Sequence, residues 1–265
     1  MLLKISHTST YRYDTQVPYA LQRLKLTPQS NSTQLVHDWK VTCKGAQREV
    51  TYTDGYANIV ELIRQERNAV EIAITAEGTV TTTNTIGVMG HEKSGTPLWV
   101  YSRQTGLTMP GENISKLAES VAGMSPRLDQ LHGLMSRIVE QMAYESGQTD
   151  VETTGEAALA AGHGVCQDLT HVFVSAARVL DIPARYVSGY LMMLDGPDQA
   201  ASHAWAEAHV DGLGWVGFDA ANDICPDDKY VRVAVGLDYR DAAPISGIRR
   251  GSGGETLEVA VKVEQ

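Results

Sequence analysis

The sequence has few cysteines, no long apolar run and no low-complexity stretch, and each shortage argues against a class of protein. Only three cysteines occur among 265 residues, they are far apart, and no two form a CxxC pair. This spacing argues against a disulfide framework and against a structural zinc site. No run of about 18 apolar residues is present, so we expect no membrane-spanning helix and no membrane partner.

Basic residues are also scarce, because 22 Lys and Arg stand against 32 Asp and Glu, giving a net charge of −10. The one basic cluster, Arg249-Arg250, is too short to bind a phosphate backbone, so we expect no nucleic-acid partner. The sequence contains no GxGxxG motif, P-loop or EF-hand loop, and we expect no cofactor.

The start of the sequence lacks the apolar core of a signal peptide. The simplest location is therefore the cytoplasm, unless a longer precursor carries an export signal.

Residues 1–84 predict a domain built from strands. Short segments rich in β-branched residues alternate with polar neighbours and are separated by turn signals such as Lys44-Gly45 and Asp54-Gly55. Strands at this spacing without intervening helices are typical of an antiparallel β-sandwich or a curled antiparallel sheet, and we expect a sandwich-like domain. The periodicity fades over residues 85–110, which contain several Gly and Pro residues, and we expect a linker there.

Residues 111–265 predict helices packed on an antiparallel sheet, which places the chain in the α+β class. Apolar positions at helical spacing predict helices over 114–122, 126–144, 155–161 and from Cys166 onward. We expect the long helix to begin with Ser125 as its N-cap and Pro126 at its first position. Five segments predict strands of this second domain: 184–193, 203–210, 214–220, 231–236 and 257–263.

Cys166 is the strongest candidate for a reactive side chain. It stands at the predicted start of a helix and follows Gly162 and Gly164. A helix N-terminus carries about half a unit of positive charge and several free N–H groups, which favour a thiolate and can bind an oxyanion. The alternative is that a lone cysteine serves only as a small buried apolar residue. The local sequence alone does not decide between these interpretations.

His203 and Asp219 lie on two segments that predict a β-hairpin. Alternation along 203–210 puts alanines on one face, suited to close packing, and puts His203, Trp205 and Glu207 on the other, which we expect to border a cleft. A three-residue loop makes Asp219 the diagonal neighbour of His203, about 7–8 Å away between backbones. A carboxylate there can fix the imidazole tautomer and stabilise the imidazolium. The alternative is a structural His–Asp pair.

Three further residues are weaker candidates for the same site. Tyr144, at the end of the long helix, is a candidate donor to an oxyanion or to the thiol, although a packed tyrosine is the simpler interpretation. Gln167 lies in the first turn of the helix that Cys166 begins, and we expect Trp205 to form a wall of the site.

No metal is expected, because the candidate side chains lack the short paired spacing typical of zinc ligands. Three other histidines are poorer candidates for a base: His163, His171 and His209.

Four segments in this order make the sequence recognisable: Gly164-Val-Cys-Gln-Asp-Leu-Thr-His171, Arg178-Val-Leu-Asp-Ile-Pro-Ala-Arg-Tyr-Val-Ser-Gly-Tyr190, Ser202-His-Ala-Trp205 and Gly214-Trp-Val-Gly-Phe-Asp219. Together they closely resemble the bacterial transglutaminase-like superfamily, and the strand-rich start is similar to the β-domain that precedes the core in these proteins. The resemblance implies a papain-like core in which Cys166, His203 and Asp219 match the catalytic positions. The sequence departs from the family at Ala220, where proline is common, and at Ala57, where glycine is common.

The three matched residues supply a nucleophile, a base and a group that orients the base. We therefore expect a cysteine-dependent acyl-transfer enzyme that acts on peptide or side-chain amide bonds of a peptide or protein through a thioester. With water as acceptor it is a cysteine peptidase or amidase, and with a primary amine as acceptor it is a transglutaminase. We favour hydrolysis slightly, because water is always present. The alternative is a catalytically inactive binding or scaffold module on the same fold, although such a module has no reason to retain the triad.

Overall fold

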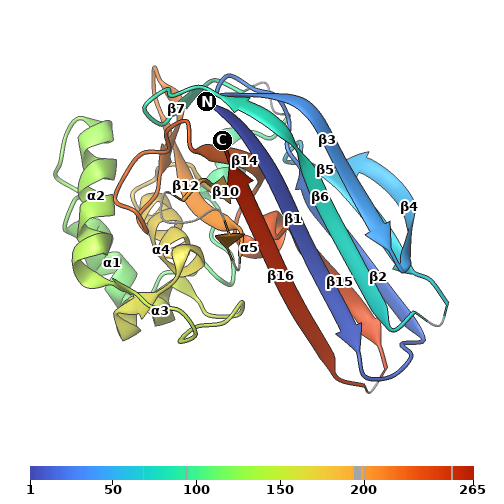
Figure 1. The fold of residues 1–265 in the computed structure, drawn as a ribbon. Coiled ribbons are helices and arrows are strands. Elements are labelled where there is room, and N and C mark those ends of the chain that lie inside the picture. The colour runs from blue at the N-terminus through green and yellow to red at the C-terminus, as the bar shows by residue number, and fades with distance from the viewer. Residues whose placement is uncertain (68, 93–94, 194–197, 200, 252) are drawn as a thin grey trace.

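The computed structural model describes residues 1–265 except 68, 93–94, 194–197, 200 and 252. One region consists of long strands, and the other has helices packed on a sheet, which confirms the α+β class (Figure 1). No helix in the described part of the chain is long and apolar enough to cross a membrane. The helices are η1 (Leu98–Ser102), α1 (Glu112–Glu119), α2 (Arg127–Gln141), α3 (Gly155–Ala161), α4 (Cys166–Val179) and α5 (Tyr239–Ala242).

The strand-rich region is an antiparallel β-sandwich, as predicted. Its two sheets have the strand orders β11-β16-β1-β6-β3 and β15-β2-β5-β4. Alternating apolar side chains from both sheets, such as Leu24, Ile63 and Ile72, are buried between them and form the core. The strands from the first part of the chain are β1 (Leu2–Tyr13), β2 (Tyr19–Thr27), β3 (Gln34–Lys44), β4 (Ala46–Thr53), β5 (Ile59–Gln65) and β6 (Glu71–Thr82).

The last two strands, β15 (Ile245–Arg250) and β16 (Glu255–Glu264), return to this sandwich. β16 pairs antiparallel with β1, and β15 pairs antiparallel with β2. This differs from the sequence prediction, which put 257–263 in the sheet of the second domain and all of 111–265 in one domain. Alternation identifies a strand and its buried face, but it does not identify the strand that will pair with it.

The second region contains a five-stranded sheet in the order β14-β10-β12-β13-β7. α4 packs on the alanine face of β12, where Ala206 and Ala208 are fully buried in one cluster with Val172 and Phe173 of the helix. β7 comes from the predicted linker, so part of that segment belongs to the sheet. The strands here are β7 (Val88–Gly90), β10 (Ala184–Leu191), β12 (His203–Val210), β13 (Gly214–Phe218) and β14 (Tyr230–Gly236), while the short β11 (Asp198–Gln199) pairs with β16.

Helix α2 is shorter than predicted at both ends. Pro126 is the extended residue before the helix, and no side chain caps it, so Ser125 is not the N-cap. After the helix the chain extends as β8 (Ala143–Tyr144), which pairs in parallel with β9 (His163–Gly164). This pairing satisfies backbone groups that a longer helix would have used. The tyrosine that the sequence places at the helix end therefore lies in a strand.

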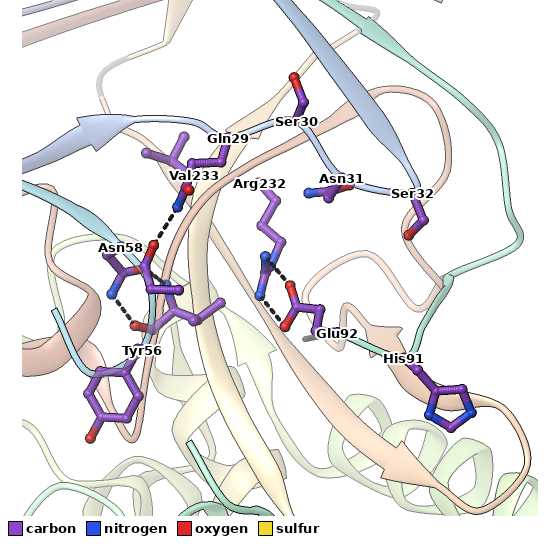
Figure 2. Close-up of a pocket in the computed structure, with 12 residues that line it drawn as sticks. Gln29, Ser30, Asn31, Ser32, Tyr56, Asn58, His91, Glu92, Arg232 and Val233 are labelled. Atoms are coloured by element: carbon purple, nitrogen blue, oxygen red, sulfur yellow. Dashed lines mark hydrogen bonds and ion pairs between the residues drawn. The ribbon is translucent and has the colours of Figure 1, made fainter. Parts of the chain in front are cut away.

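Side-chain amides of the sandwich pair with the free edge of β14. Asn58, which is labelled in Figure 2, donates to the Val235 carbonyl at 2.8 Å and accepts the N–H of the same residue at 2.8 Å. Gln34 makes the same two bonds to the backbone of Arg232, both at 2.8 Å. β14 is an edge strand, so these bonds satisfy backbone groups that a sheet edge leaves without partners. Specific hydrogen bonds thus hold the sandwich against the second sheet.

Candidate active site

Cys166 is the first residue of α4, and the chain before it is held in place by a buried carboxylate. Asp168 accepts hydrogen bonds from the Val165 N–H at 2.9 Å and from the Thr149 hydroxyl at 2.7 Å. A Cβ at Gly164 would lie 2.7 Å from the Cβ of Asp168, so the close approach requires glycine. The thiol of Cys166 is free and partly exposed at the positive end of the helix.

The β12–β13 hairpin has the register that the sequence predicts. Ala206 pairs with Phe218, and the same register places His203 opposite Ala221. His203 Nε2 lies 2.6 Å from Asp219 Oδ2. The Asp219 side chain is 1% exposed and that of His203 is 11% exposed, so little water competes for the bond. The structure therefore brings together the two side chains that the hairpin predicts as neighbours.

His203 also hydrogen-bonds with Cys166. Because Nε2 faces Asp219, Nδ1 is the ring nitrogen left to face the thiol. Burial lowers the pKa of His203, but the hydrogen bonds and charges of Asp219 and Cys166 outweigh it and raise the pKa to about 10. An imidazolium is therefore stable at neutral pH between these two groups. Cys166, His203 and Asp219 form one connected chain.

Two residues that the sequence analysis did not identify as candidates also form hydrogen bonds with Asp219. The Tyr230 hydroxyl donates to Oδ2 at 2.7 Å, and the Asn222 amide donates to the same oxygen at 2.8 Å. Oδ1 accepts the N–H of Ala221 at 3.0 Å. Burial raises the pKa of Asp219, but its bonds with His203, Asn222 and Tyr230 outweigh burial and lower the pKa. Asn222 follows Asp219 in a tight turn that the sequence could have revealed, whereas Tyr230 comes from a different strand.

Tyr144 lies beside Cys166, because β8 pairs with β9 just before α4. It lines the same cavity as the thiol. Partial burial and the charge of Cys166 raise the pKa of Tyr144, and a hydrogen bond from the Cys166 backbone partly opposes them. The hydroxyl also hydrogen-bonds with the Cys166 side chain. Tyr144 therefore contacts both the sulfur and the N–H at the helix start.

The Trp205 ring packs against the ring of His203, and Trp205 does not line the cavity that contains the thiol. The two rings are stacked with centroids 6.3 Å apart, and Trp205 also meets Tyr230 edge-on at 5.4 Å. Both Trp205 and Glu207 are buried, and of this face of β12 only His203 lines the cavity at Cys166. Trp205 and Glu207 line a separate cavity of about 30 Å³. Gln167 lies in the first turn of α4, and it is not among the described residues that line the cavity.

None of the other candidate bases lines the described part of this cavity. His171 is fully buried, its Nε2 accepts the Tyr239 N–H at 3.1 Å, and burial lowers its pKa to about 3. His209, near the other end of β12, contacts Trp215 with ring centroids 5.6 Å apart. His163 lies in β9. His203 is therefore the imidazole that the fold presents to the thiol.

A cavity of about 610 Å³ opens at Cys166 and His203. Its described lining comes from β8, the start of α4, the ends of β10 and β12, and the turn after β13. This volume accommodates an amino-acid side chain together with the amide that reacts. Within the described residues, no three His, Cys, Asp or Glu side chains converge to hold a metal ion.

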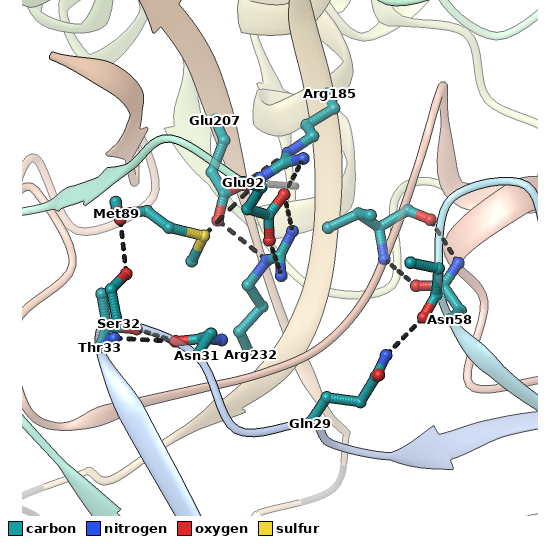
Figure 3. Close-up of polar contacts among 12 residues, drawn as sticks. Gln29, Asn31, Ser32, Thr33, Asn58, Met89, Glu92, Arg185, Glu207 and Arg232 are labelled. Carbon is teal, nitrogen blue, oxygen red and sulfur yellow. Dashed lines mark hydrogen bonds and ion pairs between the residues drawn. The ribbon is translucent and has the colours of Figure 1, made fainter. Parts of the chain in front are cut away.

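A largely buried network of four charges begins at Glu207, four residues along β12 from His203 (Figure 3). Arg185 Nε lies 2.6 Å from Glu207 Oε2, and its Nη1 lies 2.6 Å from Glu92 Oε2. Arg232 pairs with Glu92 at 2.9 Å and with Glu207 at 3.2 Å. The Arg185 guanidinium also lies over the Trp215 ring, 3.9 Å from its centroid. Two cations thus balance two anions.

A smaller cavity of about 290 Å³ lies where the sandwich meets the second sheet (Figure 2). Glu92 and Arg232 line it together with amide and hydroxyl side chains such as those of Asn31 and Ser32. Ser32 Oγ donates to the Met89 carbonyl at 2.5 Å, and Glu92 is paired with Arg232. Several polar groups of this cavity therefore already have a hydrogen-bond or ion-pair partner within the protein.

Both regions of the chain are similar to known proteins. Residues 3–81 match the bacterial transglutaminase-like N-terminal region, and residues 115–220 match the transglutaminase-like superfamily. An uncharacterized protein of Mycobacterium leprae is 29% identical over 276 residues, covering 98% of each chain. An uncharacterized protein of Mycobacterium tuberculosis is 29% identical over 292 residues, covering 98% of this chain and 91% of the relative. A crystal structure described as a "putative cysteine protease" from Cytophaga hutchinsonii has a TM-score of 0.78 at 20% identity, covering 100% of this chain and 90% of that one.

Proposed function

Since the chain belongs to the transglutaminase-like superfamily, we propose that it is a cysteine-dependent acyl-transfer enzyme acting on peptide or side-chain amide bonds. The observation that carries this proposal is the connected triad at an open cavity. His203 lies 2.6 Å from Asp219 and hydrogen-bonds with the partly exposed Cys166. Cys166 is the nucleophile, His203 carries the proton, and Asp219 orients His203.

In the first half of the reaction, the Cys166 thiolate attacks the carbonyl carbon of the amide. A C–S bond forms and the C–N bond breaks, while the His203 imidazolium gives its proton to the leaving amine. The raised pKa of His203 supports this role, because the ring stays protonated beside the thiolate until the amine needs the proton. The product of this half is a thioester on Cys166 and a free amine.

The negative oxygen formed during the attack needs hydrogen-bond donors in fixed positions. The backbone N–H of Cys166 points out of the start of α4, where no carbonyl of the helix can accept it. The Tyr144 hydroxyl contacts that same N–H and the sulfur. We assign these two groups as the oxyanion donors, with Tyr144 turning its hydroxyl from the thiol to the oxyanion.

In the second half, an acceptor cleaves the thioester. Neutral His203 takes a proton from water or from a primary amine, the new C–O or C–N bond forms, and the C–S bond breaks. We place hydrolysis ahead of transamidation, because the cavity is open and water reaches a partly exposed sulfur without a dedicated binding site. The peptidase or amidase activity is thus the first one to assay.

Replacing Cys166 by alanine tests the proposal. We expect Cys166→Ala to lose all acyl transfer and to keep its Tm, because a small, partly exposed group is removed. Activity is measured by mass spectrometry on a panel of small amides and peptides, with and without a primary amine. Cys43→Ala is the matched control, since it removes a thiol in β3 that does not line the cavity, and it should keep activity.

Two results would count against the proposal. Acyl transfer that survives in Cys166→Ala would show that Cys166 is not the nucleophile. An unmodified protein that forms no thioester with any member of the panel would favour a catalytically inactive scaffold on the same fold.

A further inference from the structure

The described lining of the cavity at Cys166 differs from that of the other cavities in its charged residues. Among its described lining residues there is no Asp, Glu, Lys or Arg. Four other cavities each contain at least two such residues, including the one in Figure 2, which contains Glu92 and Arg232. Charged residues make up 20% of the chain, so the described lining of this cavity is depleted in Asp, Glu, Lys and Arg.

Apolar side chains form much of the wall around the thiol. Val165 precedes Cys166, and Leu191 and Met193 continue from the end of β10 on the side of His203. Leu191 is buried in a cluster with Trp205 and other side chains behind His203, which fixes its position. Met193 is 45% exposed and forms part of the mouth. Ala201 and Ala221 complete the apolar lining.

Among the described lining residues, the only charges are those of the Cys166–His203 pair, and the His203 imidazolium already lies between Cys166 and Asp219. Asp219 is the nearest carboxylate, but it is 1% exposed and its two oxygens accept bonds from His203, Tyr230, Asn222 and Ala221. A charged side chain that entered would lose water without gaining an ion pair, which is unfavourable. An apolar side chain would instead gain from leaving water.

We propose that the acyl group transferred by this protein carries an uncharged, apolar side chain, which binds against Leu191 and Met193. This inference rests on the proposed function, because it assumes that Cys166 forms a thioester. It makes Met193 a specificity-determining residue, since its flexible side chain lies at the mouth of the cavity. The substrate class is therefore a peptide or amide with an aliphatic residue on the carbonyl side of the reacting bond.

The test uses p-nitrophenyl esters of N-acetyl leucine, methionine, glutamate and lysine. Esters acylate a cysteine without requiring a particular amine leaving group, so they report on the acyl group alone. Acylation is followed by release of p-nitrophenolate, and mass spectrometry after acid quenching locates the thioester, with Cys166→Ala as the blank. We expect the leucine and methionine esters to exceed the other two roughly 100-fold in kcat/KM.

A charge placed at the mouth sharpens the test. In Met193→Glu we expect kcat/KM to fall about tenfold for the leucine ester and to rise about tenfold for the lysine ester. Met193→Leu is the matched control and should keep the preference for leucine. Met193 is half-exposed, so both variants should fold, which circular dichroism verifies.

The outcomes separate the two proposals. Acylation of Cys166 by the glutamate or lysine ester as fast as by the leucine ester overturns the inference and leaves the proposed function standing. Equal behaviour of Met193→Glu and Met193→Leu overturns the assignment of Met193. No thioester on Cys166 with any ester overturns the proposed function and, with it, the inference.

Discussion

Strand β12 carries two groups of paired charges on the same face, and their surroundings differ. At one end, His203 bonds to Asp219 and faces an open cavity and a thiol. Further along, Glu207 is 2% exposed and pairs with Arg185 and Arg232 inside the protein. Sequence alternation puts His203 and Glu207 on one face with no sign of this difference. The difference arises from what packs against each end.

The comparison shows what separates a reactive ion pair from a structural one. The Glu207 network contains two cations and two anions, and Arg185 remains charged because its pKa is raised despite burial. The Arg185 guanidinium therefore does not release a proton at neutral pH. His203, by contrast, is a group that can lose a proton, and it lies between a buried carboxylate and a partly exposed sulfur. The same strand therefore holds a fixed charge cluster and a proton carrier.

Removing the carboxylate should have the largest effect on the reactive pair. For Asp219→Asn we expect kcat/KM to fall roughly 10²- to 10⁴-fold, because the imidazole loses its orienting charge. His203 should also lose the hydrogen bond and the charge of Asp219, so its pKa should fall below about 10, although the interaction with Cys166 that remains still opposes the effect of burial. The alkaline limb of the pH profile of kcat/KM should therefore move to lower pH. An alkaline limb that stays near pH 10 would contradict this account.

Breaking the structural network should affect stability and not the chemistry. For Arg185→Met we expect the free energy of unfolding to fall by about 3–5 kcal/mol, because Glu207 and Glu92 each lose a buried partner. Urea denaturation measures this change. Arg137→Met is the matched control, since Arg137 pairs with Glu140 on the surface of α2 and its loss should change stability little. Equal effects of the two variants would mean that the network contributes no more than a surface pair.

The smallest expected effect tests the hydroxyl that supports Asp219. For Tyr230→Phe we expect kcat/KM to fall about 3- to 10-fold, because Asp219 keeps its bonds with His203, Asn222 and Ala221. Tyr190→Phe is the matched control: it removes a buried hydroxyl that bonds to His7, outside the cavity. It should lower Tm to a similar extent without lowering kcat/KM. If both variants lose activity equally, the Tyr230 hydroxyl has no specific role.

The sequence predicts the His203–Asp219 pair because both residues lie on one hairpin. A three-residue loop fixes the register, and the register fixes which side chains are neighbours. The start of α4 is similarly local, since Gly164, Cys166 and Asp168 are close in sequence and pack together. The overall α+β class follows from the periodicities of the two regions. Local patterns are sufficient for these features.

Features that depend on distant pairing could not be predicted in this way. Tyr230 reaches Asp219 from the edge strand β14, and no periodic pattern connects them. β16 pairs with β1 from the opposite end of the chain, so the predicted division of 111–265 from the sandwich missed it. The burial of Glu207 depends on Arg185 and Arg232, which come from two further strands. Each of these contacts requires knowledge of the strand order.

The central claim is that the Cys166 sulfur is activated by an imidazole that a carboxylate holds. The most direct measurement is the order in which iodoacetamide alkylates the three cysteines at pH 6, located by mass spectrometry. Burial raises the pKa of Cys225 to about 11 and also raises the pKa of Cys43, so both should react slowly. We expect Cys166 to be alkylated first. Alkylation of Cys43 or Cys225 before Cys166 would contradict the account.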